Sequence, residues 1–205
     1  AITGRSPSSQ ARRLEIDRAR QKIFVRPTDE QTLRTGNPDL LVYPALICGR
    51  GIAVSNGTQT DAVAGKLGPD ADPVAVLHAA LRDWQFEPDD PNFTPRISGC
   101  VTRAAALSII KRAPDGNSMR YFFEVPLIPG TGKMIATYTG ENRNPLPGFA
   151  GEPQDVEIPW TTPQAAAQAL YEALAPQAGA PDFRVAAAAV FADAQCAMHV
   201  HNRHG

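Results

Sequence analysis

The chain of 205 residues carries 20 basic and 21 acidic side chains, a formal net charge of −1 at pH 7. This balance argues against electrostatic capture of nucleic acid or of an anionic membrane surface, and no apolar run reaches the roughly eighteen residues of a membrane-spanning helix. We therefore expect a cytoplasmic protein whose partner is a small molecule or a protein, folded as one domain over residues 1–205.

Short runs rich in β-branched and aromatic residues predict strands through the middle of the chain. The runs cover residues 22–26, 41–48, 51–56, 96–101, 106–111, 119–125 and 133–138. The segments "CGRG" and "APDGNS" between successive runs contain the glycine, aspartate and asparagine that tight hairpins need. We therefore expect largely antiparallel strands.

Helix signals are fewer, and the clearest covers residues 70–84. Asp72 is placed to cap this helix and Pro73 to open it. The apolar stripe predicted for it consists of Val74, Leu77, Leu81 and Trp84. A shorter helix is expected over residues 58–67, directly after the turn "SNG".

Another helix is predicted over residues 161–175, with Thr162 as its cap, Pro163 in its first turn and a buried stripe of Ala166, Leu170 and Leu174. Residues 183–191 and 196–201 then predict a hairpin whose alanines allow a layer to pack closely. Strands in the middle of the chain, with helices between and after them, predict an α+β layered fold with two sheets face to face.

Cysteine and histidine spacing argues against a metal site. The three cysteines are far apart and form no C-x-x-C pair, which favours buried reduced thiols over a disulfide framework or zinc site: Cys48, Cys100 and Cys196. His199 and His201 alternate along a predicted strand, but no acidic or cysteine side chain accompanies them.

The loop "FEPDDPNFTPRISG", residues 86–99, is stiffened by three prolines and presents polar groups at low entropic cost. Glu87 lies between Phe86 and Pro88, where partial desolvation would raise its pKa toward the range of an acid or base. The alternative is an ordinary surface carboxylate. Arg96 is equally well interpreted as a substrate ligand or as the ion-pair partner that anchors the loop.

Other candidates also have a plain structural alternative. Arg5 and Arg12 lie in a serine-rich segment suited to phosphate, although composition alone favours a solvated basic face. Tyr43 in an apolar strand is ordinarily a core residue. Asn56 and Gly57 are typical of a turn, and they are also able to present an amide and a closely approached backbone to a ligand. Asn144 lies in a proline-rich loop, residues 139–153, that suits a lid.

Five segments, in order, resemble the IMP cyclohydrolases of the stand-alone archaeal type and their bacterial relatives. They are "GRSPSSQARR" (4–13), "LVYP" (41–44), "AVSNGTQTD" (53–61), "FEPDDPNFTPRISG" (86–99) and "NPLPGFAGEP" (144–153). The region after residue 153 resembles the family in pattern only. Members also begin with a further strand carrying Gly-Arg, which is not found before Ala1.

The resemblance implies a four-layer αββα sandwich like that of N-terminal-nucleophile hydrolases. It also implies ring closure of a formylated aminoimidazole carboxamide ribotide to IMP with loss of water, without cofactor or metal. Tyr43 and Glu87 would then be catalytic, and the substrate ligands would be Arg5, Arg12, Asn56, Gly57, Arg96 and Asn144. Family precedent and apolar loops also favour a homo-oligomer.

Two alternative functions follow from the same sequence. The scaffold is compatible with another dehydrative cyclisation, for example in secondary metabolism, because a fold does not fix its chemistry. A non-catalytic ribotide-binding protein is the alternative from a different class, although the presence of both Tyr43 and Glu87 argues against it.

Overall fold

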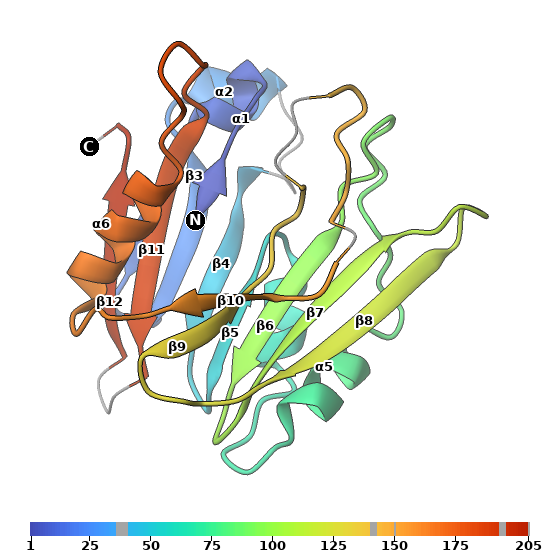
Figure 1. Ribbon diagram of the computed structural model, residues 1–205, viewed down its shortest axis with the longest axis vertical. Coiled ribbons are helices and arrows are strands. Elements are labelled where there is room, and N and C mark those ends of the chain that lie inside the picture. The colour runs from blue at the N-terminus through green and yellow to red at the C-terminus, as the bar shows by residue number, and fades with distance from the viewer. Residues whose placement is uncertain (36–40, 140–142, 150, 193–195, 205) are drawn as a thin grey trace. The chain divides into compact units, whose positions relative to one another are not determined.

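The computed structural model describes residues 1–35, 41–139, 143–149, 151–192 and 196–204 (Figure 1). The chain divides into two compact units, here called unit 1 (residues 1–46 and 159–205) and unit 2 (residues 47–158). Strand β4 (Tyr43–Cys48) crosses the boundary between these ranges. Each unit is described by itself below, and the single domain expected from the sequence stays a prediction.

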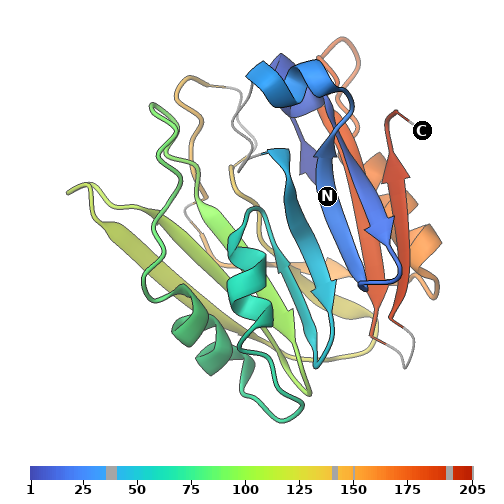
Figure 2. The same ribbon diagram turned by 180° about the vertical axis from the view of Figure 1, so that it is seen from behind.

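Unit 1 contains an antiparallel sheet in the order β1-β11-β12, formed by Ile2–Thr3, Arg184–Phe191 and Ala197–Asn202. Helix α6 (Pro163–Ala173) contacts β11 and β12. The antiparallel hairpin of β2 (Arg12–Asp17) and β3 (Lys22–Pro27) lies in front of them in Figure 2, with α6 behind. The described part of the unit also contains two short helices, α1 (Pro7–Gln10) and α2 (Glu30–Thr35).

One side-chain amide joins the hairpin of unit 1 to its sheet. The Asn202 Nδ2 atom of β12 donates to the Leu14 carbonyl of β2 at 3.0 Å, and the Leu14 N–H donates to Asn202 Oδ1 at 2.8 Å. The amide thus satisfies both backbone groups of a buried residue, as a neighbouring strand would.

The packing of α6 corrects one expectation about its buried stripe. Thr162 caps the helix through the Ala165 N–H and Pro163 opens it, as predicted. Ala166 and Ala167 are buried, whereas the side chains of Leu170 and Leu174 are 36% and 39% exposed, so the prediction for these two leucines was wrong. The alanines of β11 and β12 form the predicted hairpin, and a flat surface of small side chains admits the alanine face of the helix most closely.

Unit 2 is built on four antiparallel strands in the order β5-β6-β7-β8, formed by Ile52–Ser55, Arg96–Val101, Ala105–Arg112 and Ser118–Val125. Helices α4 (Gln59–Ala64) and α5 (Pro73–Leu81) cover one face of these strands (Figure 2). A second antiparallel pair joins β9 (Thr131–Met134) to β10 (Gln154–Glu157).

Helix α5 forms as its sequence predicts. The Asp72 carboxylate accepts from the Val74 N–H at 2.9 Å and Pro73 occupies the first turn. Leu77 and Leu81 are buried in the core of unit 2, here called the helix-face core, with Ile110 of β7. Val74 and Trp84 are partly buried against the same core.

For the other elements, the sequence predicts the type of structure better than its first and last residues. The strand expected over 133–138 was wrong in its bounds, because β10 offers β9 only four paired residues and Tyr138 makes only an isolated bridge to Gly148. The sequence pattern missed β1, β2, α1, α2 and β10. All pairings given above are antiparallel, as predicted. The presence of both helices and strands confirms the mixed α and β class. None of the described helices has the length and hydropathy to cross a membrane.

Candidate functional site

The loop of residues 86–99 is held by an ion pair between two predicted site residues. Glu87 is 5% exposed, and its Oε1 lies 3.3 Å from Nη1 of Arg96. The Glu87 N–H donates to the Thr94 carbonyl at 2.9 Å, and Arg96 Nε donates to the Gln85 carbonyl at 2.9 Å. The Arg96 guanidinium also lies 5.2 Å from the centre of the Trp84 ring. Of the two roles open to Arg96 in the sequence, the structure shows the ion-pair partner.

Hydrogen bonds link the ion pair to the turn before α4 and to the first residue of that helix. Arg96 Nη1 donates to Gln59 Oε1 at 3.0 Å, and Gln59 Nε2 donates to Asn56 Oδ1 at 3.0 Å. Asn56 Nδ2 donates to the Pro95 carbonyl, while Asn56 Oδ1 accepts from the Ile97 N–H, both at 2.9 Å. Asn56, Gly57, Gln59, Glu87 and Arg96 are together called the Arg96 cluster below.

Gly57 leaves the space into which two members of this cluster pack. A Cβ atom built on Gly57 would lie 2.6 Å from Gln59 Oε1 and 2.7 Å from Arg96 Nη1. Both atoms belong to flexible side chains, but their shared hydrogen bond holds them in place. A methyl group therefore has to break that bond or move the turn.

We expect Gly57→Ala to lower the free energy of unfolding by about 1–3 kcal/mol, the usual cost of overpacking. Gly49→Ala is the matched control, because a Cβ on Gly49 meets nothing within 4 Å. Urea unfolding followed by tryptophan fluorescence measures both variants. A Gly57→Ala protein as stable as Gly49→Ala would contradict the close packing described here.

The Arg96 cluster lies at the helix-covered face of the unit 2 sheet. Arg96 pairs with Ile110 across β6 and β7, and directly opposed residues of paired strands share a face. Ile110 packs in the helix-face core. The cluster is thus a buried charged pair surrounded by amides, which holds the Glu87 carboxylate in one position.

Two further side chains fix the loop to its surroundings within unit 2. Asp89 Oδ1 accepts from the Thr94 N–H at 2.6 Å, and the Thr94 hydroxyl bonds to Asp89 Oδ2 and to the Tyr138 hydroxyl. Asn92 Oδ1 accepts from the Leu146 N–H at 3.0 Å and so joins this loop to the proline-rich loop. Asn92 thus fastens the loop to another loop, whereas Arg96 anchors it through Glu87 and Gln59.

The predicted phosphate ligands lie in unit 1. Arg12 donates to the carbonyls of Ser9 at 2.9 Å and Thr3 at 3.2 Å, and the Arg5 guanidinium lies 5.4 Å from the centre of the Phe183 ring. The serine hydroxyls that we expected to assist them serve the short helix α1, whose capping box is formed by Ser6 and Ser9. Both arginines remain predicted ligands.

The other two predicted residues lie outside the Arg96 cluster. Tyr43 begins β4 in unit 1 and is 4% exposed, so its ring is part of the core. Asn144 is exposed in the proline-rich loop of unit 2. The structure therefore brings together four of the eight predicted site residues in one described cluster: Asn56, Gly57, Glu87 and Arg96.

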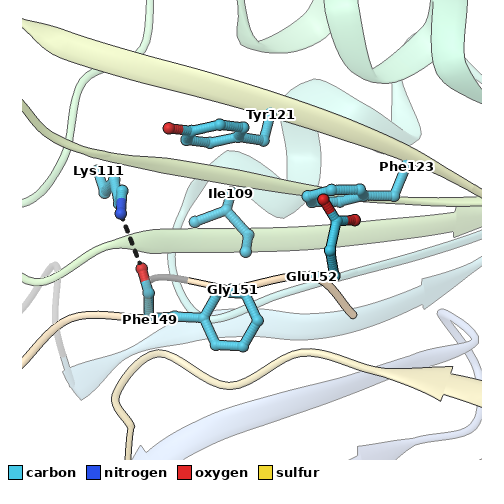
Figure 3. A pocket seen from close by; sticks show the side chains of 7 residues that line it. All are labelled: Ile109, Lys111, Tyr121, Phe123, Phe149, Gly151 and Glu152. Carbon is cyan, nitrogen blue, oxygen red and sulfur yellow. Dashed lines mark hydrogen bonds between the residues drawn. The ribbon is translucent and has the colours of Figure 1, made fainter. Parts of the chain in front are cut away.

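A hollow of about 300 Å³, here called the Lys111 hollow, opens on unit 2 between two strands and the proline-rich loop (Figure 3). Lys111 Nζ donates to the Phe149 carbonyl at 3.1 Å across it. The hollow is lined by Ile109, Lys111, Tyr121, Phe123, Phe149, Gly151 and Glu152. A second hollow of about 530 Å³ shares Lys111 and is also lined by Asn92, Phe93 and Arg112.

Comparison with known proteins assigns this chain to a family. The family described as "IMP cyclohydrolase-like protein" matches residues 1–195, nearly the whole sequence. The chain belongs to this family. An IMP cyclohydrolase of Methanothrix thermoacetophila is 32% identical over 126 residues. The aligned part covers 60% of this chain and 59% of the relative, so the chain spans less than two thirds of the relative's length.

Family membership confirms the resemblance on which the sequence interpretation rests. The five ordered segments between residues 4 and 153 all fall within the matched range. In this IMP cyclohydrolase-like chain, two of those segments supply the Arg96 cluster: the turn after β5 and the acidic loop before β6. The two segments are far apart in sequence and meet through the pairing of β5 with β6 and through the side chains of Asn56, Gln59 and Arg96.

The cysteines of this family member differ in burial. Burial, and to a lesser extent the Asp72 charge, raises the pKa of the Cys100 thiol to about 12. Cys48 is also buried, whereas Cys196 is partly exposed. Among the described residues no three His, Cys, Asp or Glu side chains gather as metal ligands would.

We expect a thiol reagent at pH 8 to modify Cys196 first and to leave Cys100 unreacted until the protein unfolds, because only the thiolate reacts. Mass spectrometry of peptides after short labelling, with and without denaturant, identifies the modified cysteines. Rapid labelling of Cys100 in the native protein would contradict its placement in the core.

Sequence reasoning missed the residues that extend the site. Gln59 lies inside the segment "AVSNGTQTD". Its position, two residues after Asn-Gly and at the start of a helix, was the signal that could have identified it as a site residue. Lys111 and Tyr121 were read only as strand residues. The face that a strand residue takes depends on the register, and the sequence of one strand does not give it.

Proposed function

We propose that this chain closes the second ring of a purine, converting a formylated aminoimidazole carboxamide ribotide to IMP. The observation that carries this proposal is the family match over residues 1–195, supported by the relative's name. The Arg96 cluster adds a physical argument, since a fixed, buried carboxylate suits proton transfer. We also infer the four-layer αββα sandwich of the family for the assembled units.

The reaction needs two proton movements and no redox change. The carboxamide nitrogen attacks the formyl carbon, a C–N bond forms, and a proton passes from that nitrogen to the formyl oxygen. The resulting hydroxyl then leaves as water, while the former formamide nitrogen loses its proton and a C=N bond forms. A protein accelerates both steps by holding the amide against the formyl group and by supplying a proton donor and acceptor.

We assign proton transfer to Glu87 and Tyr43. Arg96 holds the Glu87 carboxylate in place at 3.3 Å, and Asn56 and Gln59 hold Arg96. Tyr43 lies in β4 and its ring is buried. Its hydroxyl is proposed to orient the amide of the substrate or to donate a hydrogen bond to the developing oxyanion. Asn56, Gly57, Arg96 and Asn144 remain proposed substrate contacts.

The ribotide phosphate is assigned to Arg5 and Arg12. Arg5→Ala is expected to raise KM for the ribotide about 10- to 100-fold, because a charge-assisted hydrogen bond contributes about 1.5–3 kcal/mol. The riboside that lacks the phosphate should be converted equally by wild type and variant. Steady-state kinetics with both compounds measures the difference, and Arg18→Ala, at an exposed arginine of the same unit, is the control. An unchanged KM for the ribotide would remove Arg5 from the phosphate site.

The proposed reaction is tested by identifying the product. Purified protein and the formylated ribotide should yield IMP, recognised by chromatography and by a mass lower than that of the substrate by one water. Binding of the ribotide without conversion would favour the non-catalytic alternative. Neither binding nor conversion would favour a different cyclisation substrate.

A further inference from the structure

The second hollow of about 530 Å³, here called the Arg112 hollow, takes no part in the proposed reaction. It opens in unit 2 where β7 ends and β8 begins, beside the loop of residues 86–99. Two of its lining residues are cations, Lys111 and Arg112. Its apolar walls include Phe93, Pro114 and Met119. Positive charge and apolar surface thus meet in one hollow.

The two cations of the hollow have no carboxylate assigned to them. Lys111 and Arg112 are the last two residues of β7, so their side chains leave the strand on opposite sides, and both line the hollow at its end. Lys111 Nζ donates to the Phe149 carbonyl, which leaves two of the three ammonium donors. The ion pairs seen in the described part of unit 2 use other cations: Arg82, Arg96, Arg103 and Lys133. The hollow therefore offers an anion both charge and N–H donors.

Phe93 has an unusual backbone conformation that holds its ring beside Arg112. Its φ angle is 45°, in the left-handed region that bulky residues rarely adopt. Asp89 fixes this conformation, because its carbonyl accepts from the Phe93 N–H at 3.0 Å and its Oδ1 accepts from the Thr94 N–H at 2.6 Å. Strain of this kind persists where the surroundings hold it, and it is common in ligand sites.

The Arg112 guanidinium lies over the Phe93 ring, 4.2 Å from the ring centre. Stacking of this kind orients the planar group and leaves the N–H donors at its edge. Arg112 is exposed and Phe93 is partly buried, so the pair is open to a ligand from solvent. The stacked pair thus presents a planar set of donors next to an apolar wall.

We propose that the Arg112 hollow binds an organic monocarboxylate with an apolar body. The carboxylate accepts two N–H groups of Arg112, in the bidentate geometry that a guanidinium favours, and Lys111 adds a second positive charge. The apolar body packs on Phe93, Pro114 and Met119. A ribotide suits this hollow poorly, because its ribose hydroxyls would lie against apolar walls without hydrogen-bond partners. The volume of about 530 Å³ is typical of small-molecule sites.

Titration of the protein with phenylacetate, followed by calorimetry and by NMR chemical shifts, tests this site. Phenylacetamide has the same apolar body without the charge and should bind at least about 10-fold more weakly, as the loss of a charge-assisted hydrogen bond implies. Arg112→Gln should weaken phenylacetate binding by a similar factor. Arg82→Gln removes an exposed cation of the same unit, paired with Asp83, and should leave the affinity unchanged.

The outcomes separate this inference from the proposed reaction. Phenylacetate that binds as described in the presence of saturating IMP supports the inference, whether or not the protein closes the purine ring. Displacement of phenylacetate by IMP would overturn it, because the hollow would then belong to the ribotide site. Equal affinity of wild type and of Arg112→Gln, shown by thermal unfolding to be folded, would also overturn it. Binding of inorganic phosphate at the hollow without binding of phenylacetate would do the same.

Discussion

Replacing Glu87 with glutamine is expected to lower the rate of ring closure about 10²- to 10⁴-fold, the contribution of a positioned proton-transfer group. The amide keeps the shape of the side chain and an acceptor for Arg96 Nη1, which lies 3.3 Å from Glu87 Oε1. Arg96 also retains its bonds to Gln59 and to the Gln85 carbonyl. Ligand binding should therefore stay within a few-fold of wild type while turnover is lost.

Steady-state turnover and IMP affinity, measured on the same preparation, separate these two effects. Glu124→Gln removes an exposed carboxylate of the same unit and is the matched control, expected to retain full turnover. Unchanged turnover in Glu87→Gln would remove Glu87 from the mechanism. Loss of IMP binding together with turnover would make it a binding residue.

Removing the cation of the same pair has the largest expected effect on stability. Arg96→Met leaves the Glu87 carboxylate buried without its cation, and breaking a buried pair in this way costs about 3–5 kcal/mol. Arg96 side-chain exposure is 13% and that of Glu87 is 7%, so solvent screens the pair little. Urea unfolding should show a lower midpoint with an unchanged slope.

Two further variants test the cause of that loss. Arg82→Met removes the cation of an exposed pair with Asp83, which should change stability by less than about 1 kcal/mol. The double variant Glu87→Gln, Arg96→Met removes both charges. Its loss in free energy of unfolding should be smaller than the sum of the losses in the two single variants, because neither charge is left buried without its partner. Additive losses would show that the two side chains act independently.

Local signals predicted elements well where one segment determines its own structure. Asp72 and Pro73 specify the start of α5, and its spacing of leucines specifies the buried face. The buried face of α6 was wrong at Leu170 and Leu174, because the partner surface decides which face packs. The charged residues of β2 concealed a strand whose alternate residue Leu14 is buried.

In the candidate site too, the sequence predicted the residues of a single segment but not those that the fold brings to it from elsewhere. Glu87 and Arg96 were predicted from one short loop, and the ion pair was one of two roles that the loop allowed. Gln59 joins them from another segment, 37 residues before Arg96. Lys111 and Tyr121 meet only through the register of β7 and β8, which is a property of the paired strands.

The most direct test of the proposed function follows ring closure by the ultraviolet change that accompanies purine formation. Wild-type protein is mixed with the formylated aminoimidazole carboxamide ribotide, and the rate is compared with that of the ribotide alone. We expect the wild-type protein to convert the ribotide rapidly to IMP. A folded protein that does not accelerate the reaction would contradict the proposed function.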